Sequence, residues 1–331
     1  MFEEIMFGIK VIVWTFAVIF IAFLTEWFYR KVLAHMQHRV GPKLAGTVGI
    51  LQPIADFIKL MRKHQLSPEG TDDPLVDFTA IFGLWIMVIL TMVLPIFGTE
   101  GLIGFHGDVV FVLALLAIAS LVYIITPYLF PSPYPTIGAG RRAELYLSYE
   151  IPMFLAFAAV VFVAGSLKIS DIIYAVTIVK GGIPAGILLI PALIVAVISS
   201  MARLKKIPFD IPEAETEIAG GWEAELAGRR LAFFNLLTDM KLFTLSGLIA
   251  TFFLGGPLGP MFVVSGLEWL LVPFWHAFWF FLKTIIVIYV ITAISAATAR
   301  FRIDQVLRIF WNKLLSLSII QIVILLVWWG L

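Results

Sequence analysis

The chain has 331 residues, of which 61% are hydrophobic and only 14% are charged, with a net charge of +1 and a mean hydropathy of +1.02. Soluble globular domains carry about 25% charged residues, so the composition excludes a soluble protein and indicates a polytopic membrane protein. The absence of cysteine excludes disulfides, thiolate-bound zinc and cysteine-ligated iron–sulfur clusters on this chain. The five histidines show no metal-ligand spacing. We therefore expect no metal or cofactor on the chain, and no nucleic acid among its partners.

Apolar runs divide the chain into predicted membrane spans, since about 20 apolar residues cross the hydrocarbon core as a helix. Such windows lie at 6–29, 78–97, 109–130, 145–165, 183–202, 231–254, 270–297 and 311–330. We predict an all-α polytopic membrane protein with about eight transmembrane helices, folded as a single membrane domain over residues 1–331. The first window is too long for a cleavable signal peptide, so we interpret it as a span.

Basic residues are strongly biased to one side of this predicted topology. Of the 23 lysines and arginines, 18 fall in or just beyond loops 30–77, 131–144, 203–230 and 298–310. Only Lys10, Lys168 and Lys180 fall on the opposite side. Because cytoplasmic loops carry the excess of Lys and Arg, these four loops are predicted to face the cytoplasm. Both termini are then expected on the outer side of the cell membrane.

Loop 30–77 contains the segment GTVGILQPIADFIKLMRK, in which apolar residues recur at helical spacing. The segment ends in basic residues, and Pro53 would sit in the first turn, where proline is tolerated. This pattern predicts an amphipathic helix that lies along the membrane surface or under a docked partner.

The loop at 207–230 reads IPFDIPEAETEIAGGWEAELAGRR and gathers six carboxylates within an apolar chain. They are Asp210, Glu213, Glu215, Glu217, Glu223 and Glu225. One interpretation is structural, with Asp210 as a helix N-cap, Glu213 at N3 and the other acids solvated. The other is functional, because apolar residues interleave with the acids and Glu213 and Glu217 would share a helix face. Packed carboxylates that cannot all ionise have coupled, raised pKa values and can hold and pass protons.

The predicted spans carry ionisable residues of their own. These are Glu26, Glu144, Glu150, Asp239, Lys241 and Lys283. Each costs about 2.5–3.5 kcal/mol at a helix centre, so such residues usually face a protein interior or water and mark an ion path. Glu26 and Glu144 lie near span ends and could instead snorkel to the interface. Asp239 and Lys241 are two apart and are predicted to point to different faces.

Four motifs carry a resemblance to a known family. They are RVGPKLAGTVGILQPIADFIKL (39–60), SYEIP (148–152), IPFDIPEAETEI (207–218) and RFRIDQVLRIFWNKLLSLS (300–318). In this order they resemble the heel subunit of respiratory complex I, also called chain 1 or the H subunit of NADH:quinone oxidoreductase. The superfamily also includes the matching subunits of membrane-bound hydrogenases, formate hydrogenlyases and archaeal sulfane reductases.

The resemblance implies a subunit that anchors a soluble redox arm to the membrane arm and links it to ion translocation through buried acids. Glu150 matches the SYE acid, Asp210, Glu213, Glu215 and Glu217 match those of PFD-x-PEAE, Glu225 aligns with a loop acid, and Asp239 falls near a family glutamate. The docking segment that the resemblance implies comprises Arg39, Gly41, Pro42, Lys43, Gln52, Asp56 and Lys59. Ordinary positive-inside topology is the alternative for its basic residues. Implied partners are soluble iron–sulfur or hydrogenase-like subunits on the cytoplasmic side, and antiporter-like membrane subunits within the bilayer.

The chain departs from quinone-linked members just before PFD. Those members usually have an acid-threonine-asparagine-arginine run, whereas this chain reads SSMARLKKIPFD, and its GWEAELAGRR loop lacks the usual tyrosine-serine. Both changes touch the region that lines the quinone chamber, which favours a hydrogenase-like or sulfane-reductase type of complex. A quinone-binding heel subunit of a NADH:quinone oxidoreductase is the alternative. A stand-alone ion transporter would be expected to show repeated halves, and the sequence shows none. A purely structural anchor is the third alternative.

Overall fold

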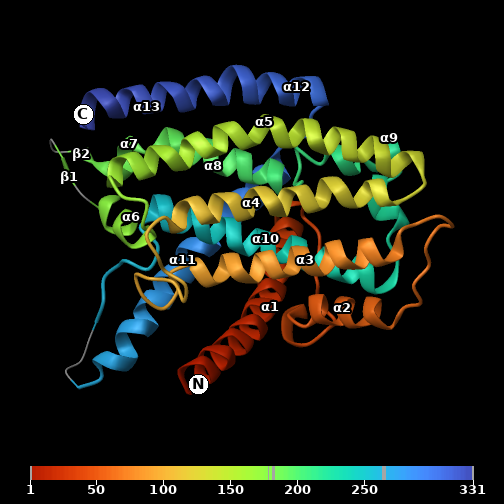
Figure 1. The fold of residues 1–331 in the computed structure, drawn as a ribbon, viewed down its shortest axis with the longest axis horizontal. Coiled ribbons are helices and arrows are strands. Elements are labelled where there is room, and N and C mark those ends of the chain that lie inside the picture. Colours follow the sequence, from red (N-terminus) through yellow and green to blue (C-terminus); the bar gives the residue numbers. More distant parts are fainter. Residues whose placement is uncertain (1, 178, 181–182, 263–265, 330–331) are drawn as a thin grey trace.

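The computed structural model describes residues 2–177, 179–180, 183–262 and 266–329, and their regular structure is almost entirely helical (Figure 1). The long helices are α1 (Phe2–Met36), α3 (Asp73–Val93), α4 (Asp108–Ile125), α5 (Pro133–Ala164), α10 (Gly228–Leu254), α11 (Glu268–Ala297) and α13 (Leu315–Trp329). Shorter helices are α2 (Gln52–Arg62), α6 (Ile169–Ala175), α7 (Ala185–Leu188), α8 (Ile190–Arg203), α9 (Glu215–Ile218) and α12 (Ile303–Arg308). The 3₁₀ turns are η1 (Thr47–Gly49), η2 (Thr126–Leu129), η3 (Ile211–Glu213) and η4 (Gly221–Glu225), and η5 (Ile309–Leu314) is a π-helix. Strands β1 (Val179–Lys180) and β2 (Ile183–Pro184) pair antiparallel, with Val179 opposite Pro184.

The predicted polytopic helical membrane fold is confirmed. Among the described residues, seven helices are long and apolar enough to cross a membrane, the last running through α12, η5 and α13. The fifth predicted span, 183–202, is shorter than expected, because α7 ends at Leu188 and α8 begins anew with Pro191 in its first turn. At about 1.5 Å per residue, the 14 residues of α8 reach about 21 Å, less than the roughly 30 Å hydrocarbon core.

Two boundaries differ from the sequence-based expectation. The predicted loop 131–144 lies mostly inside α5, which begins at Pro133 and continues unbroken into the fourth span. The loop 298–310 contains α12 and the start of η5. Hydropathy locates the membrane-crossing part of a helix but not its polar extension into water, and for this reason it predicts both segments as loops.

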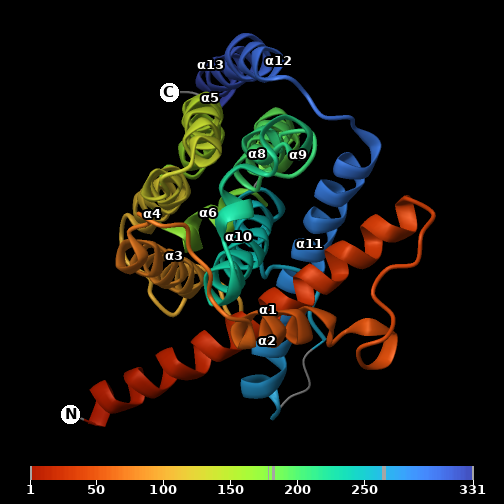
Figure 2. The same cartoon turned by 90° about the vertical axis from the view of Figure 1, so that its right-hand side faces the viewer.

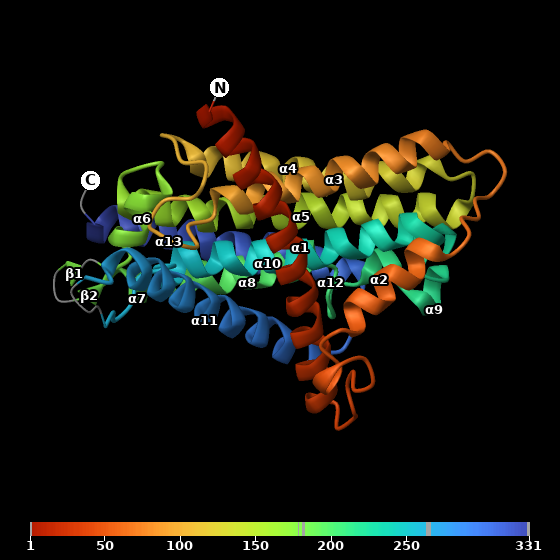
Figure 3. The ribbon, with the colours of Figure 1, turned by 90° about the horizontal axis from the view of Figure 1, so that it is seen from below.

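Helix α10 forms the centre of the bundle, with α3, α4 and α5 in a row on one side and α11 and α1 on the other (Figure 2). Of its most apolar window, 89% is buried, against 17% for α1, which crosses the other long helices at a steep angle (Figure 3). Small residues bring the neighbours close. A Cβ at Gly83 would lie 2.6 Å from Leu237, and one at Gly247 would lie 3.0 Å from Phe280. Such close backbone approach is how helices associate in lipid.

The predicted amphipathic helix is α2, and Pro53 occupies its first turn. Its apolar face packs onto the bundle, where the Phe57 ring lies 5.5 Å from that of Phe23 on α1 and 6.5 Å from that of Phe233 on α10. Lys59 and Arg62 at its basic end are exposed. The helix therefore braces the junction of α1 and α10.

Candidate functional site

A buried ion pair between Glu150 and Arg203 lies where α4, α5 and α8 meet. Glu150 projects from α5, and the fully buried Arg203 side chain reaches it from the last residue of α8. The guanidinium also donates to the carbonyl oxygen of Leu116 at 2.6 Å and to the Ser120 hydroxyl at 3.1 Å, both on α4. Arg203 thus ties three helices to one acid.

Further cations surround this pair. Arg142 on α5 is buried and donates to the carbonyl oxygen of Arg203 at 3.1 Å. The Lys241 ammonium on α10 lies 3.8 Å from the centre of the Tyr123 ring, which Arg142 also faces at 5.1 Å. Arg142 Nε and Nη1, Lys241 Nζ and one oxygen of Glu150 are buried without a hydrogen-bond partner among the described residues. Buried polar atoms are almost always satisfied, so these four are places where water would bind.

Lys205 connects this interior to the acidic loop. Its ammonium pairs with Glu213 and, at 3.0 Å, with Glu223, and the Trp222 indole N–H donates to Glu213 at 3.2 Å. Burial lowers the pKa of Lys205 to about 8, although Glu223 opposes this shift. We call Arg142, Glu150, Arg203, Lys205, Glu213, Glu223 and Lys241 the central cluster.

A second group of charges lies where α1, α2 and α10 meet. Arg30 binds Glu26 at 2.6 Å and Asp56 of α2 at 3.0 Å, and the Asp239 carboxyl is in hydrogen-bonding contact with Glu26. Lys206 lies 3.8 Å from the centre of the Tyr29 ring; burial lowers its pKa, but Tyr29, Glu26 and Asp239 raise it above its ordinary value. A cavity of about 30 Å³ borders Arg30, Asp56 and Asp239, room for about one water. We call Glu26, Arg30, Asp56, Lys206 and Asp239 the flanking cluster.

The two clusters lie on opposite sides of α10. Asp239 contacts the flanking cluster, and Lys241, two residues on, contacts the central one. The prediction that these two side chains point to different faces is confirmed. Lys205 and Lys206 divide in the same way, although they are consecutive in the chain.

Other predicted site residues lie outside both clusters. Asp210 is the N-cap residue of η3 but makes no capping hydrogen bond, and it pairs with Arg300 instead, so the capping interpretation is wrong for this residue. Glu217 is exposed and pairs with Arg141 at 2.5 Å, Glu144 is exposed, and Glu225 is half-buried. Lys283 donates to the carbonyl oxygen of Leu258 at 2.6 Å, which ties α11 to the loop after α10. The side chain of Glu215 lies outside the described part of the chain.

The predicted docking residues divide into an exposed set and an internally bonded set. Arg39, Lys43 and Lys59 are exposed. Gln52 donates to Asp56 at 3.1 Å, and the Pro42 carbonyl oxygen accepts from Lys31 at 3.0 Å. A Cβ at Gly41 would lie 3.1 Å from Ala34, so Gly41 packs closely on the end of α1. The internally bonded residues thus shape the loop that presents the exposed cations.

Sequence reasoning misses three central residues, Arg142, Arg203 and Lys205. In the sequence all three serve only as evidence for cytoplasmic loops, because the positive-inside rule explains basic residues next to spans without assigning them a partner. The signal in the sequence is the run SSMARLKK, in which Arg203 follows an apolar stretch with no polar linker between them.

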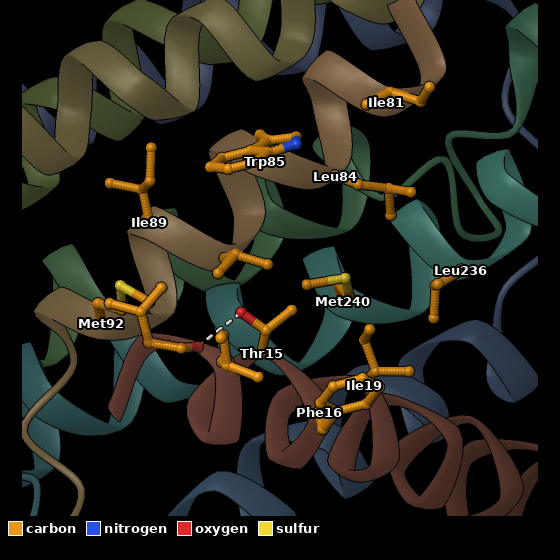
Figure 4. Close-up of a pocket in the computed structure, with 13 residues that line it drawn as sticks. Thr15, Phe16, Ile19, Ile81, Leu84, Trp85, Ile89, Met92, Leu236 and Met240 are labelled. Carbon is orange, nitrogen blue, oxygen red and sulfur yellow. Dashed lines mark hydrogen bonds between the residues drawn. The ribbon is translucent and has the colours of Figure 1, made fainter. Parts of the chain in front are cut away.

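Two observations bear on ligands. Within the described ranges, no three His, Asp or Glu side chains gather as a metal site requires. An apolar pocket of about 460 Å³ lies between α1, α3 and α10, far richer in carbon than in polar atoms (Figure 4). The one hydroxyl drawn there, that of Thr15, donates to the carbonyl oxygen of Val11 at 2.8 Å. The pocket is therefore lined by no ionisable side chain.

Known proteins resemble this chain over most of its length. A family model for NADH dehydrogenase matches residues 9–326. The H subunit of the NADH-quinone oxidoreductase of Rickettsia rickettsii is 32% identical over 324 residues, which cover 98% of this chain and 93% of that protein. The H subunit of the Neisseria meningitidis serogroup C enzyme is 33% identical over 315 residues, which cover 93% and 86% of the two chains.

Among solved structures, a chain of the membrane-bound sulfane sulfur reductase, an archaeal respiratory membrane complex, superposes with a TM-score of 0.81. It is 26% identical, and the match covers 96% of this chain and 99% of that one. The resemblance carried by the four motifs is therefore confirmed, and this chain belongs to the NADH dehydrogenase family of complex I-like membrane subunits.

Proposed function

We propose that this chain is the membrane-anchoring and ion-coupling subunit of a complex I-like respiratory oxidoreductase. It would connect a soluble redox arm on the cytoplasmic side to proton or sodium translocation in the membrane. The chain itself would carry no redox centre, and the iron–sulfur clusters would reside on partner subunits. Both termini would face the outer side.

The observation that carries this proposal is the continuity of the central cluster. Glu213 and Glu223 in the loop contact Lys205, and Arg142, Arg203 and Lys241 continue from there to Glu150 between α5 and α8. An anchor needs no buried charges, because a buried ion pair costs desolvation that apolar packing would avoid. Ionisable residues kept inside a membrane bundle mark ion paths.

The coupling step would use the partners of Glu150. While Arg203 holds one carboxylate oxygen, the other has no partner among the described residues and can accept a proton. A charge change at the loop would alter the pairing of Lys205, and the close cations Arg142 and Arg203 would pass that change to Glu150 as a shift in its proton affinity. Redox chemistry outside the membrane would thereby set the protonation of an acid inside it.

Two kinds of complex fit this role. The sulfane-reductase or hydrogenase type is favoured by the basic run before PFD, in which Arg203 and Lys205 pair with acids, and by the structural match. The quinone-reducing type is favoured by the Rickettsia and Neisseria relatives, which are 32% and 33% identical. Purification of the intact complex separates the two types. Its electron acceptor is identified by assaying the complex for hydrogen evolution, polysulfide reduction and quinone reduction.

The decisive experiment substitutes Glu150→Gln in an assembled complex and measures electron transfer and ion-gradient formation together. We expect electron transfer to continue while the gradient is lost. Glu144→Gln is the matched control, since Glu144 lies on the same helix but is exposed. Unchanged pumping in Glu150→Gln would leave only an anchoring role. A protein that purifies without iron–sulfur or antiporter-like partners and transports ions alone would instead be a stand-alone transporter.

A further inference from the structure

A groove runs along α1, apart from the residues of both clusters. It has a volume of about 430 Å³ and is formed by one face of α1, by α11 and by the segment that follows α3. Its lining is apolar except for Lys10 at the N-terminal end of α1. The groove is separate from the proposed coupling path, and none of the residues of the two clusters lines it.

The wall of this groove is held rigidly. The Trp14 indole N–H donates to the Thr91 hydroxyl on α3 at 3.2 Å, and its ring meets that of Phe97 edge-on, with centroids 6.1 Å apart. In front of this wall, Val13 and Phe97 are more than half exposed. Exposed apolar sides favour an apolar occupant. Because the groove is preformed, binding of that occupant needs little reorganisation.

Measured along α1, the groove is about as long as the hydrocarbon part of one leaflet of a bilayer is thick. Its lining on α1 extends from Ile9 and Lys10 to Ile21. Eleven steps of about 1.5 Å make about 16 Å, and half of the roughly 30 Å hydrocarbon core is about 15 Å. An acyl chain that starts at Lys10 and follows the inclined α1 would therefore fill the groove along its length.

Lys10 supplies the polar end. Its side chain is exposed, and it makes no ion pair with any residue in the described part of the chain. It is also one of only three basic residues on the outer side of the predicted topology, so the positive-inside rule gives no reason for it. We propose that this groove binds an anionic glycerophospholipid, with the phosphate at Lys10 and one acyl or isoprenoid chain between α1 and α11.

A transmembrane helix of a partner fits the groove less well. Helix pairs in membranes approach through small residues, yet Ile9, Val13, Trp14, Phe97 and Phe281 are all large. Ala17 is the single small side chain on the α1 wall. A flexible hydrocarbon chain can follow such an uneven surface, whereas a helix would leave gaps.

The test uses the intact complex in mild detergent, with phosphatidylglycerol titrated in native mass spectrometry. We expect Lys10→Gln to weaken retention of one lipid about tenfold, the worth of one charged hydrogen bond. Ala17→Phe, which fills the groove, should abolish that binding event. Lys168→Gln is the control, because it removes the same charge at a lysine already paired with Glu100 at 2.5 Å.

A photoreactive amino acid at Val13 reports the occupant directly. Cross-linking to lipid supports the proposal, and cross-linking to another subunit overturns it. Lipid retention that is unchanged in both Lys10→Gln and Ala17→Phe also overturns it. If only Ala17→Phe weakens binding, the assignment of Lys10 to the phosphate is wrong. Lys10→Gln alters an exposed side chain, so it remains informative if Ala17→Phe fails to assemble.

Discussion

The central and flanking clusters are built from the same residue types but with opposite balances of charge. The central cluster has four bases and three acids, and its bases Arg203, Lys205 and Lys241 are buried. The flanking cluster has three acids and two bases, and its Arg30 side chain is 41% exposed. Separated only by α10, they present a base-rich interior next to an acid-rich rim.

This difference assigns the two clusters different physical roles. In the central cluster the buried Glu150 is paired with the buried Arg203, so a change in the pairing of the neighbouring cations would act directly on this acid. The flanking acids are close to one another, and the base that pairs with two of them, Arg30, is 41% exposed, so water screens its charge. Lys205 and Lys206, consecutive in the chain, join the two.

The largest expected contrast is between Arg203→Gln and Arg30→Gln. Arg203→Gln leaves the buried Glu150 charge without its base, which should destabilise the subunit by about 3–5 kcal/mol. Arg30→Gln should cost less, because water screens the 41% exposed Arg30 side chain, although the variant also leaves the 10% exposed Glu26 without its base. Thermal melting of the detergent-solubilised complex measures both changes.

The double variant Glu150→Gln/Arg203→Gln sharpens this result. It removes both charges, so its loss of stability should be smaller than that of Arg203→Gln alone. Equal losses of stability in Arg203→Gln and Arg30→Gln would show that the central ion pair is no more desolvated than the flanking cluster.

How far the sequence leads differs between the two clusters. Hydropathy and motif spacing correctly predict most of the spans, α2, the family and the opposed faces of Asp239 and Lys241. They do not predict that Arg203 meets a carbonyl oxygen 87 residues earlier in the chain, or Glu150 53 residues earlier. Apolar spans have little helical amphipathicity, so no periodic signal says which face meets which neighbour. Long-range pairing in this protein is decided by packing around α10.

The pH dependence of coupling tests the link that Lys205 makes between the acidic loop and the rest of the central cluster. The Lys205 pKa of about 8 lies below the ordinary value of 10.5, so its ion pairs with Glu213 and Glu223 are lost as pH rises through about 8. Ions translocated per electron should fall over this range. Lys205→Arg keeps its charge at all relevant pH values and should remove the fall.

Stability provides an independent check on Lys205, with a different sign. Between pH 8 and 10.5 the unfolded chain retains a proton that the folded chain has released. This group alone therefore makes folding more favourable as pH rises through that window, and Lys205→Gln should remove its contribution. A pH profile that is identical in wild type and Lys205→Gln, for both coupling and melting, would contradict the lowered pKa.

A smaller effect is expected at Asp239 in the flanking cluster. Asp239→Asn removes one of two carboxyl groups in contact, and a hydrogen bond to Glu26 remains possible. The melting temperature should stay the same or rise slightly, since like-charge repulsion is relieved. A loss of stability comparable to that of Arg203→Gln would show that Asp239 matters for folding as much as the buried central pair. The two clusters would then not differ in this respect.

The smallest effect is expected at the exposed pair of Glu217 and Arg141. Glu217→Gln should change stability by about 0–1 kcal/mol, as is usual for surface ion pairs, although the two groups lie 2.5 Å apart. Ion translocation should also be unaffected, because the Glu217 side chain is 51% exposed and contacts neither cluster. Gradient formation in vesicles, compared between Glu217→Gln and Glu213→Gln, measures this directly. Equal loss in both variants would mean that the coupling path runs along the surface of the acidic loop, and burial would then no longer distinguish the acids that carry it.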